Sequence, residues 1–138
     1  MRSGHSLWEL VAALTIMATL AAMGAPAAVR ARDRAAARAA AITVRATLSS
    51  ARDAALSSAA AALVVIDASV ATVSIIVNRD TILRHSLTGD LRARLSASRD
   101  TIRFGPTGRA FGASNTTLVI RSGFAAETIT VSRVGRVR

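Results

Sequence analysis

The feature that most constrains this chain is a run of 20 uncharged residues, Leu10 to Val29, near its amino end. A helix of about 20 apolar residues is long enough to cross a hydrocarbon core of roughly 30 Å. Only Arg2 supplies a basic side chain before the run, and the acidic Glu9 stands at its head. A secretory signal has a shorter apolar region followed by a cleavage site. The pattern favours a retained, single-pass membrane anchor.

The charges that flank this run give a conflicting indication of its orientation. Four arginines follow it closely, whereas only Arg2 and the amino terminus precede it: Arg30, Arg32, Arg34 and Arg38. Positive charge is expected on the cytoplasmic side of a membrane. This count alone would place the carboxyl-terminal part of the chain inside the cell.

Helix-forming sequence continues beyond the apolar run. Residues 27–62 are rich in alanine and arginine and contain neither glycine nor proline, so we predict one helix from residue 5 to about 61. Pro26 lies inside it, and its missing N–H predicts a kink there.

Five arginines of this helix are predicted to lie on one face. At 100° per residue they fall within an arc of about 80°: Arg30, Arg34, Arg38, Arg45 and Arg52. Such a stripe is most simply the solvated face of a surface helix. The alternative is a basic stripe that meets lipid headgroups, acidic neighbours or DNA.

From about residue 62 the pattern changes to short, β-branched segments. We predict six or seven strands, with turns at 67–69, 78–80 and around Gly105, Pro106 and Gly108. Residues 89–100 are a loop or a strand with one basic face. Strands without intervening helices indicate antiparallel pairing. The predicted fold class is therefore α+β: a long amino-terminal helix followed by a small antiparallel β-sheet or β-sandwich domain.

The residues needed for catalysis or metal binding are scarce. The chain has no cysteine and two histidines, His5 and His85, and neither belongs to a cluster with ligand spacing. No G-x-S-x-G motif and no phosphate-binding loop is present. We therefore expect no enzymatic activity, no metal and no cofactor.

The net charge of +10 permits a polyanionic partner. All 18 basic residues are arginine, which binds phosphate and carboxylate groups in bidentate fashion better than lysine does. The absence of lysine is better explained by the codon usage of a GC-rich genome. The position of each arginine therefore carries more information than the total.

The amino end resembles the class III signal of type IV pilins and type II secretion pseudopilins. The resemblance covers the first 26 residues through Gly4, His5, Leu7, Glu9, Leu10 and Pro26. It implies that prepilin peptidase removes a leader, residues 1–4, by cleavage between Gly4 and His5, followed by N-methylation of His5. The family usually has phenylalanine at the position of His5. The resemblance also implies that Glu9 pairs with a free amino terminus and sets helix register during assembly.

The carboxyl end resembles the β-domain of the GspH/FimT group of minor pseudopilins and minor pilins. The segments "IRFGPTGRAFG" and "ETITVSRVGRVR" carry it through Phe104, Pro106, Gly108, Gly135 and Arg136. The implied organisation has a membrane-spanning assembly half of the helix (5–29), an extracytoplasmic half (30–61) and a β-domain (62–138). The implied location is the bacterial inner membrane, with this domain outside the cytoplasm in a periplasmic or surface filament. We let this specific motif override the charge count.

Two functions within that group stay open. The favoured one is a structural subunit of a type II secretion pseudopilus or type IV pilus, with other subunits, membrane lipid and secreted cargo as partners. The alternative is a FimT-like minor pilin that binds DNA for uptake in natural transformation through the terminal "GRVR". Its candidate contacts are Arg136, Arg138 and Arg133, extended by Arg121 or Arg109 if the fold brings them near. Residues 62–138 hold 11 arginines and five acids, a net of +6, which favours nonspecific DNA affinity.

A rival of another class is a secreted or membrane-anchored binding module unrelated to pili. It predicts cleavage after one of residues 22–28, or no cleavage.

Overall fold

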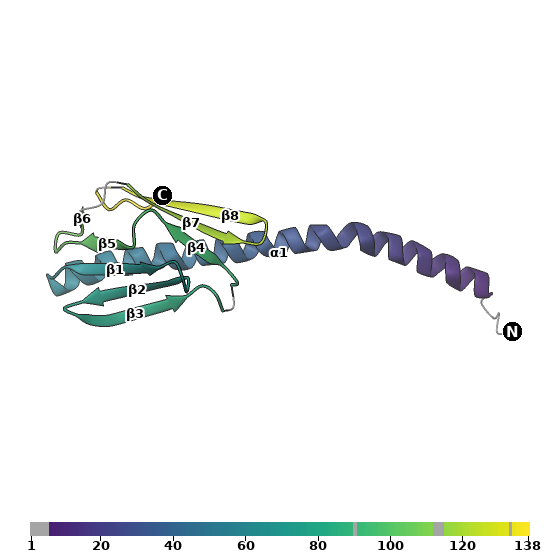
Figure 1. Ribbon diagram of the computed structural model, residues 1–138, viewed down its shortest axis with the longest axis horizontal. Helices are drawn as coiled ribbons and strands as arrows, with labels where there is room; N and C mark the ends of the chain where they lie inside the picture. The colour runs from purple at the N-terminus through teal and green to yellow at the C-terminus, as the bar shows by residue number, and fades with distance from the viewer. Residues whose placement is uncertain (1–5, 90, 112–114, 133) are drawn as a thin grey trace. The chain divides into compact units, whose positions relative to one another are not determined.

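The computed structural model describes residues 6–89, 91–111, 115–132 and 134–138. Figure 1 shows one long helix, α1 (Leu7–Ser58), followed by antiparallel strands. The chain divides into two units: an amino-terminal unit, Met1–Arg32, and a carboxyl-terminal unit, Asp33–Arg138. The predicted α+β class is confirmed.

The amino-terminal unit contains the apolar part of α1. Every described residue from Ser6 to Arg32 is exposed, and an 18-residue stretch of α1 has a mean hydropathy of 1.8. By length and composition α1 can cross a membrane. Its two threonines satisfy their hydroxyls within the helix, since Thr15 donates to the Val11 carbonyl and Thr19 to that of Ile16, both at 2.8 Å. These bonds make the threonines compatible with an apolar environment.

The ends of α1 have local causes. Ser6 precedes the first turn, and its hydroxyl accepts the Glu9 N–H at 3.3 Å. At the other end Ala59 adopts a left-handed conformation with φ 50°, which stops the helix two to three residues before the predicted end. Pro26 lies inside α1 and cannot donate to the Ala22 carbonyl. A kink there stays a prediction.

The described part of the carboxyl-terminal unit contains eight strands rather than six or seven. They are β1 (Ala62–Asp67), β2 (Thr72–Val77), β3 (Asp80–Ser86), β4 (Arg94–Ala97), β5 (Thr101–Phe104), β6 (Ala110–Phe111), β7 (Thr116–Ser122) and β8 (Ala125–Val131). One sheet has the order β3-β2-β1-β5-β6 and the other β4-β7-β8, and all pairings are antiparallel. The ambiguous segment 89–100 contains β4.

The predicted turns are confirmed. Asp67 accepts hydrogen bonds from the Ser69 hydroxyl at 2.5 Å and the Ser69 N–H at 3.0 Å, and these bonds lower the pKa of the Asp67 carboxyl. Between β2 and β3, Asn78 and Arg79 both have positive φ, the pattern of a type I′ hairpin turn. The Gly108 N–H closes the turn after β5 by donating to the Gly105 carbonyl at 2.8 Å.

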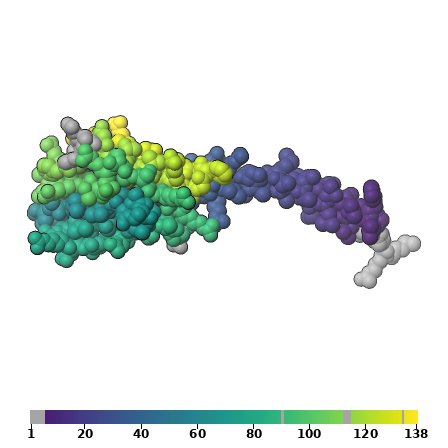
Figure 2. All heavy atoms as spheres, viewed as in Figure 1, coloured from purple at the N-terminus to yellow at the C-terminus, as the bar shows by residue number. Residues whose placement is uncertain are grey.

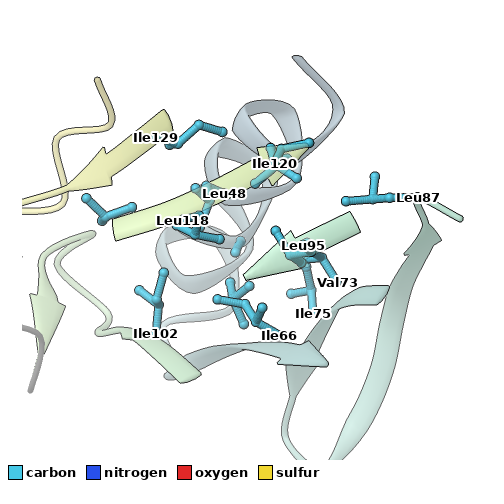
Figure 3. Close-up of a cluster of buried hydrophobic side chains, with 14 of the residues drawn as sticks. Leu48, Ile66, Val73, Ile75, Leu87, Leu95, Ile102, Leu118, Ile120 and Ile129 are labelled. Carbon is cyan, nitrogen blue, oxygen red and sulfur yellow. The ribbon is translucent and has the colours of Figure 1, made fainter. Parts of the chain in front are cut away.

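One core joins the second half of α1 to both sheets. Figure 3 shows Leu48 of α1 among side chains of the five-stranded sheet, such as Ile66 and Ile102, and of the three-stranded sheet, such as Leu118. The surface of the unit in Figure 2 passes from the first strands, in teal, to β7 and β8, in yellow-green. The sequence left open a single sheet or a sandwich, and the structure has two antiparallel sheets that pack on the same helix.

The buried stripe of α1 is made almost entirely of small side chains. Its members recur every three or four residues, as expected for one helix face: Ala37, Ala40, Ala41, Val44, Thr47, Leu48, Ala51 and Ala55. Alanine has no atoms beyond Cβ, so the strands can approach the helix backbone closely. This close approach lets a small core with few aromatic residues pack without large gaps.

This packing predicts that Ala51→Leu destabilises the protein. Ala51 is 0% exposed, and forcing a larger side chain into a filled core costs about 1–3 kcal/mol. Thermal unfolding followed by circular dichroism should show a lowered Tm. The matched control is Ala46→Leu on the exposed face of α1, and equal Tm values for the two variants would contradict this account of the core.

Candidate functional site

The predicted processing site and assembly residue lie at the amino end. Gly4 and His5 fall outside the described residues. Glu9 is exposed in the first turn of α1, where a negative charge is favoured by the helix dipole.

Sequence reasoning missed a structural role for Glu9. Ser6 and Glu9 have the spacing of a capping box, in which serine at the N-cap is followed three residues later by glutamate. Half of that arrangement is present, because the Glu9 N–H donates to the Ser6 hydroxyl. Glu9 therefore belongs to a favourable helix start, whatever its charge does in an assembly.

The carboxyl-terminal residues fold back along β8. The Thr130 and Arg138 backbones exchange two hydrogen bonds of 2.9 Å, and the Ser132 N–H donates to the Arg136 carbonyl at 2.9 Å. Val131 and Val137 form an antiparallel bridge between these pairs. The terminal segment thus adds to the edge of the three-stranded sheet.

This pairing places Arg136 and Arg138 on one face, because alternate residues of an extended segment point the same way. Both arginines are exposed, whereas Val137 between them packs against the core. The sequence predicted that these two side chains project from one face, and their exposure agrees with this. Their binding to DNA stays a prediction.

A hollow lies over the terminal segment and the adjacent end of β8. Two guanidinium groups, an amide and two hydroxyls border it, from Arg136, Arg138, Asn115, Thr130 and Ser132, and the sixth lining residue is Val134. Among the described residues that line it, none is acidic. The hollow can therefore accept an anion without repulsion from its own walls.

The other predicted members of the basic patch have different positions. Arg133 lies outside the described residues. Arg121 is opposite Ala126, whereas Thr130 is opposite Thr117, so Arg121 is about 13 Å along β7 from the terminal segment. Arg109 is closer, since Gly135 lies against the backbone on both sides of it, at Gly108 and Ala110.

Three of the residues that carry the carboxyl-terminal resemblance, Phe104, Gly108 and Gly135, meet in space. A Cβ added at Gly135 would be 3.2 Å from the Gly108 carbonyl oxygen and 3.4 Å from Cε1 of Phe104. Gly135 also has φ 78°, which disfavours any other residue. The glycine of the terminal motif is therefore required by the fold itself.

The arginine stripe of α1 is solvated, as the simpler interpretation predicted. Arg34, Arg38, Arg45 and Arg52 are exposed. The Arg38 Nε lies 3.8 Å from Oε1 of Glu127 on β8, in a pair that solvent reaches, so its contribution to stability is small.

Within the described ranges, no group of three or more acidic or histidine side chains could hold a metal ion. His85 lies on β3 opposite Val73.

The chain is similar to known proteins in structure rather than in sequence. No protein-family model and no curated protein sequence matches the chain. Two crystal structures of the type IV minor pilin FimU from Pseudomonas aeruginosa strain PAO1 do match. The form in space group P21 has a TM-score of 0.63 and 17% identity, covering 74% of this chain and 86% of that chain. The chain has the type IV pilin fold.

The second FimU structure, in space group P65, gives the same result. Its TM-score is 0.61 at 17% identity, covering 73% of this chain and 90% of that chain. The chain has the long amino-terminal helix and the antiparallel strands that the sequence predicted. The expected pilin-like architecture is thereby confirmed as a fold.

Proposed function

We propose that this chain is a minor pilin or pseudopilin, a structural subunit of a type IV pilus or type II secretion pseudopilus. The observation that carries the proposal is an exposed apolar helix of membrane-spanning length joined to a β-domain in the type IV pilin fold. An apolar helix surface needs lipid or similar helices around it. Both are available to a subunit that moves from a membrane into a filament.

Gly4, His5 and Glu9 would have separate roles in such a subunit. Prepilin peptidase would cut between Gly4 and His5 and leave a new amino terminus at His5, open to N-methylation. Glu9, four residues further on, would attract that terminus on the same or a neighbouring subunit. Opposite charges interact more strongly in a low-dielectric surrounding than in water, which favours one helix register over others.

A second candidate function is DNA binding by the terminal segment, as in the FimT-like alternative. The hollow bordered by Arg136 and Arg138 supports it, because these guanidiniums are exposed on one face and no acidic residue lines the hollow. Exposed arginines of this kind contact phosphates without reading sequence. The structural role of Gly135 weighs against inferring DNA binding from the motif alone, so the assembly function remains our main proposal.

Cleavage by prepilin peptidase can be read from the mass of the protein. Intact-mass measurement of the membrane-extracted protein, from cells with an active prepilin peptidase, should show loss of residues 1–4. Gly4→Val should retain them. A wild-type protein of full mass, or one cleaved after residues 22–28, would instead support the unrelated binding module.

A substitution can separate the charge of Glu9 from its capping role. Glu9→Gln keeps a residue that can complete a capping box but removes the charge. We expect this variant to insert and be processed normally, with its incorporation into sheared filaments reduced about tenfold if the lost attraction is near 1.4 kcal/mol. Ser6→Ala is the control, since it removes the cap and keeps the charge. Normal incorporation of Glu9→Gln would contradict the assembly role.

DNA binding can be measured with the full chain in detergent. The double variant Arg136→Gln, Arg138→Gln should weaken binding to duplex DNA and lower the slope of its salt dependence by about two. The control, Arg45→Gln with Arg84→Gln, loses the same charge from exposed sites on α1 and β3. Equal losses in both double variants would indicate attraction by net charge alone.

A further inference from the structure

The hairpin between β7 and β8 ends in an exposed aromatic side chain. Two residues, Gly123 and Phe124, connect Ser122 to its partner Ala125. Gly123 has φ 51° and Phe124 is absent from the residues with positive φ, which is the pattern of a type II′ turn. The Phe124 side chain is 88% exposed, more than any other large apolar side chain described in the carboxyl-terminal unit.

A carboxylate of α1 holds this turn in place. The Phe124 N–H donates to Oδ2 of Asp33 at 3.1 Å across 91 positions of sequence. Gly123 is closely packed against the same carboxylate, so that a Cβ there would collide with it. The turn is visible beside α1 in Figure 1. The exposure of Phe124 therefore belongs to a fixed turn rather than to a loose loop.

Asp33 is also the residue at which the carboxyl-terminal unit begins. Three residues of the sequence stand between it and Val29, the last residue of the uncharged run. The carboxylate that holds the hairpin turn is therefore close in sequence to the end of the uncharged run.

Two further arginines lie at this end of the three-stranded sheet. Arg121, three residues before Phe124, is directly opposite Arg94 of β4, and both are exposed. Like charges in such a pair repel one another. Within the described residues neither has an ion-pair partner, and Glu127, the acidic residue on β8, lies near Arg38.

We propose that this hairpin end, formed by Phe124, Arg121 and Arg94, is a contact site for an anionic lipid surface. Phe124 enters the boundary between headgroups and acyl chains, and the two guanidiniums bind lipid phosphates. The exposed apolar side chain and the paired positive charges complement that surface, and the membrane anchor of the proposed function keeps the chain at such a surface. The inference rests on the membrane anchoring in the proposed function.

The native Trp8 allows anchoring and contact to be measured separately. It is the single tryptophan of the chain and lies in the apolar part of α1. The full-length protein is reconstituted into vesicles whose lipids carry bromine on their acyl chains, a quencher of tryptophan fluorescence. Quenching of Trp8 reports that α1 is inserted, and its absence would count against anchoring, and with it against the contact.

The contact itself is read in a Trp8→Phe background. Phe124→Trp should be quenched by lipids brominated near the headgroup, and more strongly in vesicles containing phosphatidylglycerol than in phosphatidylcholine alone. Val134→Trp is the control, because Val134 is also exposed but lies beyond the other end of β8. With Trp8 quenched in the parent protein, equal quenching at positions 124 and 134 would overturn the proposal and leave the anchor intact.

The charge requirement is tested in the same reporter. Arg94→Gln with Arg121→Gln should reduce quenching at position 124 to the level of the Val134→Trp control in phosphatidylglycerol vesicles. Arg84→Gln with Arg103→Gln removes the same charge from exposed positions of β3 and β5 and should leave the quenching unchanged. If quenching at position 124 appears only when subunits assemble at high protein density, the hairpin contacts a neighbouring subunit and the lipid proposal fails.

Discussion

The close packing of α1 against the strands is the constraint on which the rest of this structure depends. The inner side chains of both sheets belong to one core, and α1 contributes mostly alanine to it. A close-packed interior leaves little room for rearrangement. The positions of the hairpin turns and of the terminal segment are consequences of where the sheets can lie against the helix.

The glycines around this core show why a motif can be recognised without revealing its purpose. Gly108 packs near Arg52 and Leu56 at the end of α1, and Gly135 packs on Gly108 in turn. These two glycines and Phe104 form one cluster. A change at Gly135 would disturb this cluster whether or not Arg136 touches DNA, so only substitutions of the arginines themselves can report on a ligand.

The sequence predicted features that depend on local patterns. The apolar run, the continued helix, the antiparallel strands and the turns at Asp67 and Asn78 all follow from composition or residue type over a few positions. The choice between one sheet and two could not be made this way, because β4 pairs with β7 more than 20 residues further along the chain. The bond from Phe124 to Asp33 was missed for the same reason. The strand β6 has two residues, too few for a recognisable pattern. The capping box at Ser6 and Glu9 was readable in the sequence and was overlooked.

The threonine bonds in the apolar part of α1 have a consequence for how such helices meet. With Thr15 and Thr19 turned to their own backbone, the surface from Leu10 to Val29 is nearly uniform in its chemistry. When two such helices pack, different axial offsets bury similar apolar surface and therefore differ little in free energy. A helix of this kind offers little along its length that distinguishes one axial offset from another. In the proposed filament, the Glu9 carboxylate at one end would therefore be the group that distinguishes them.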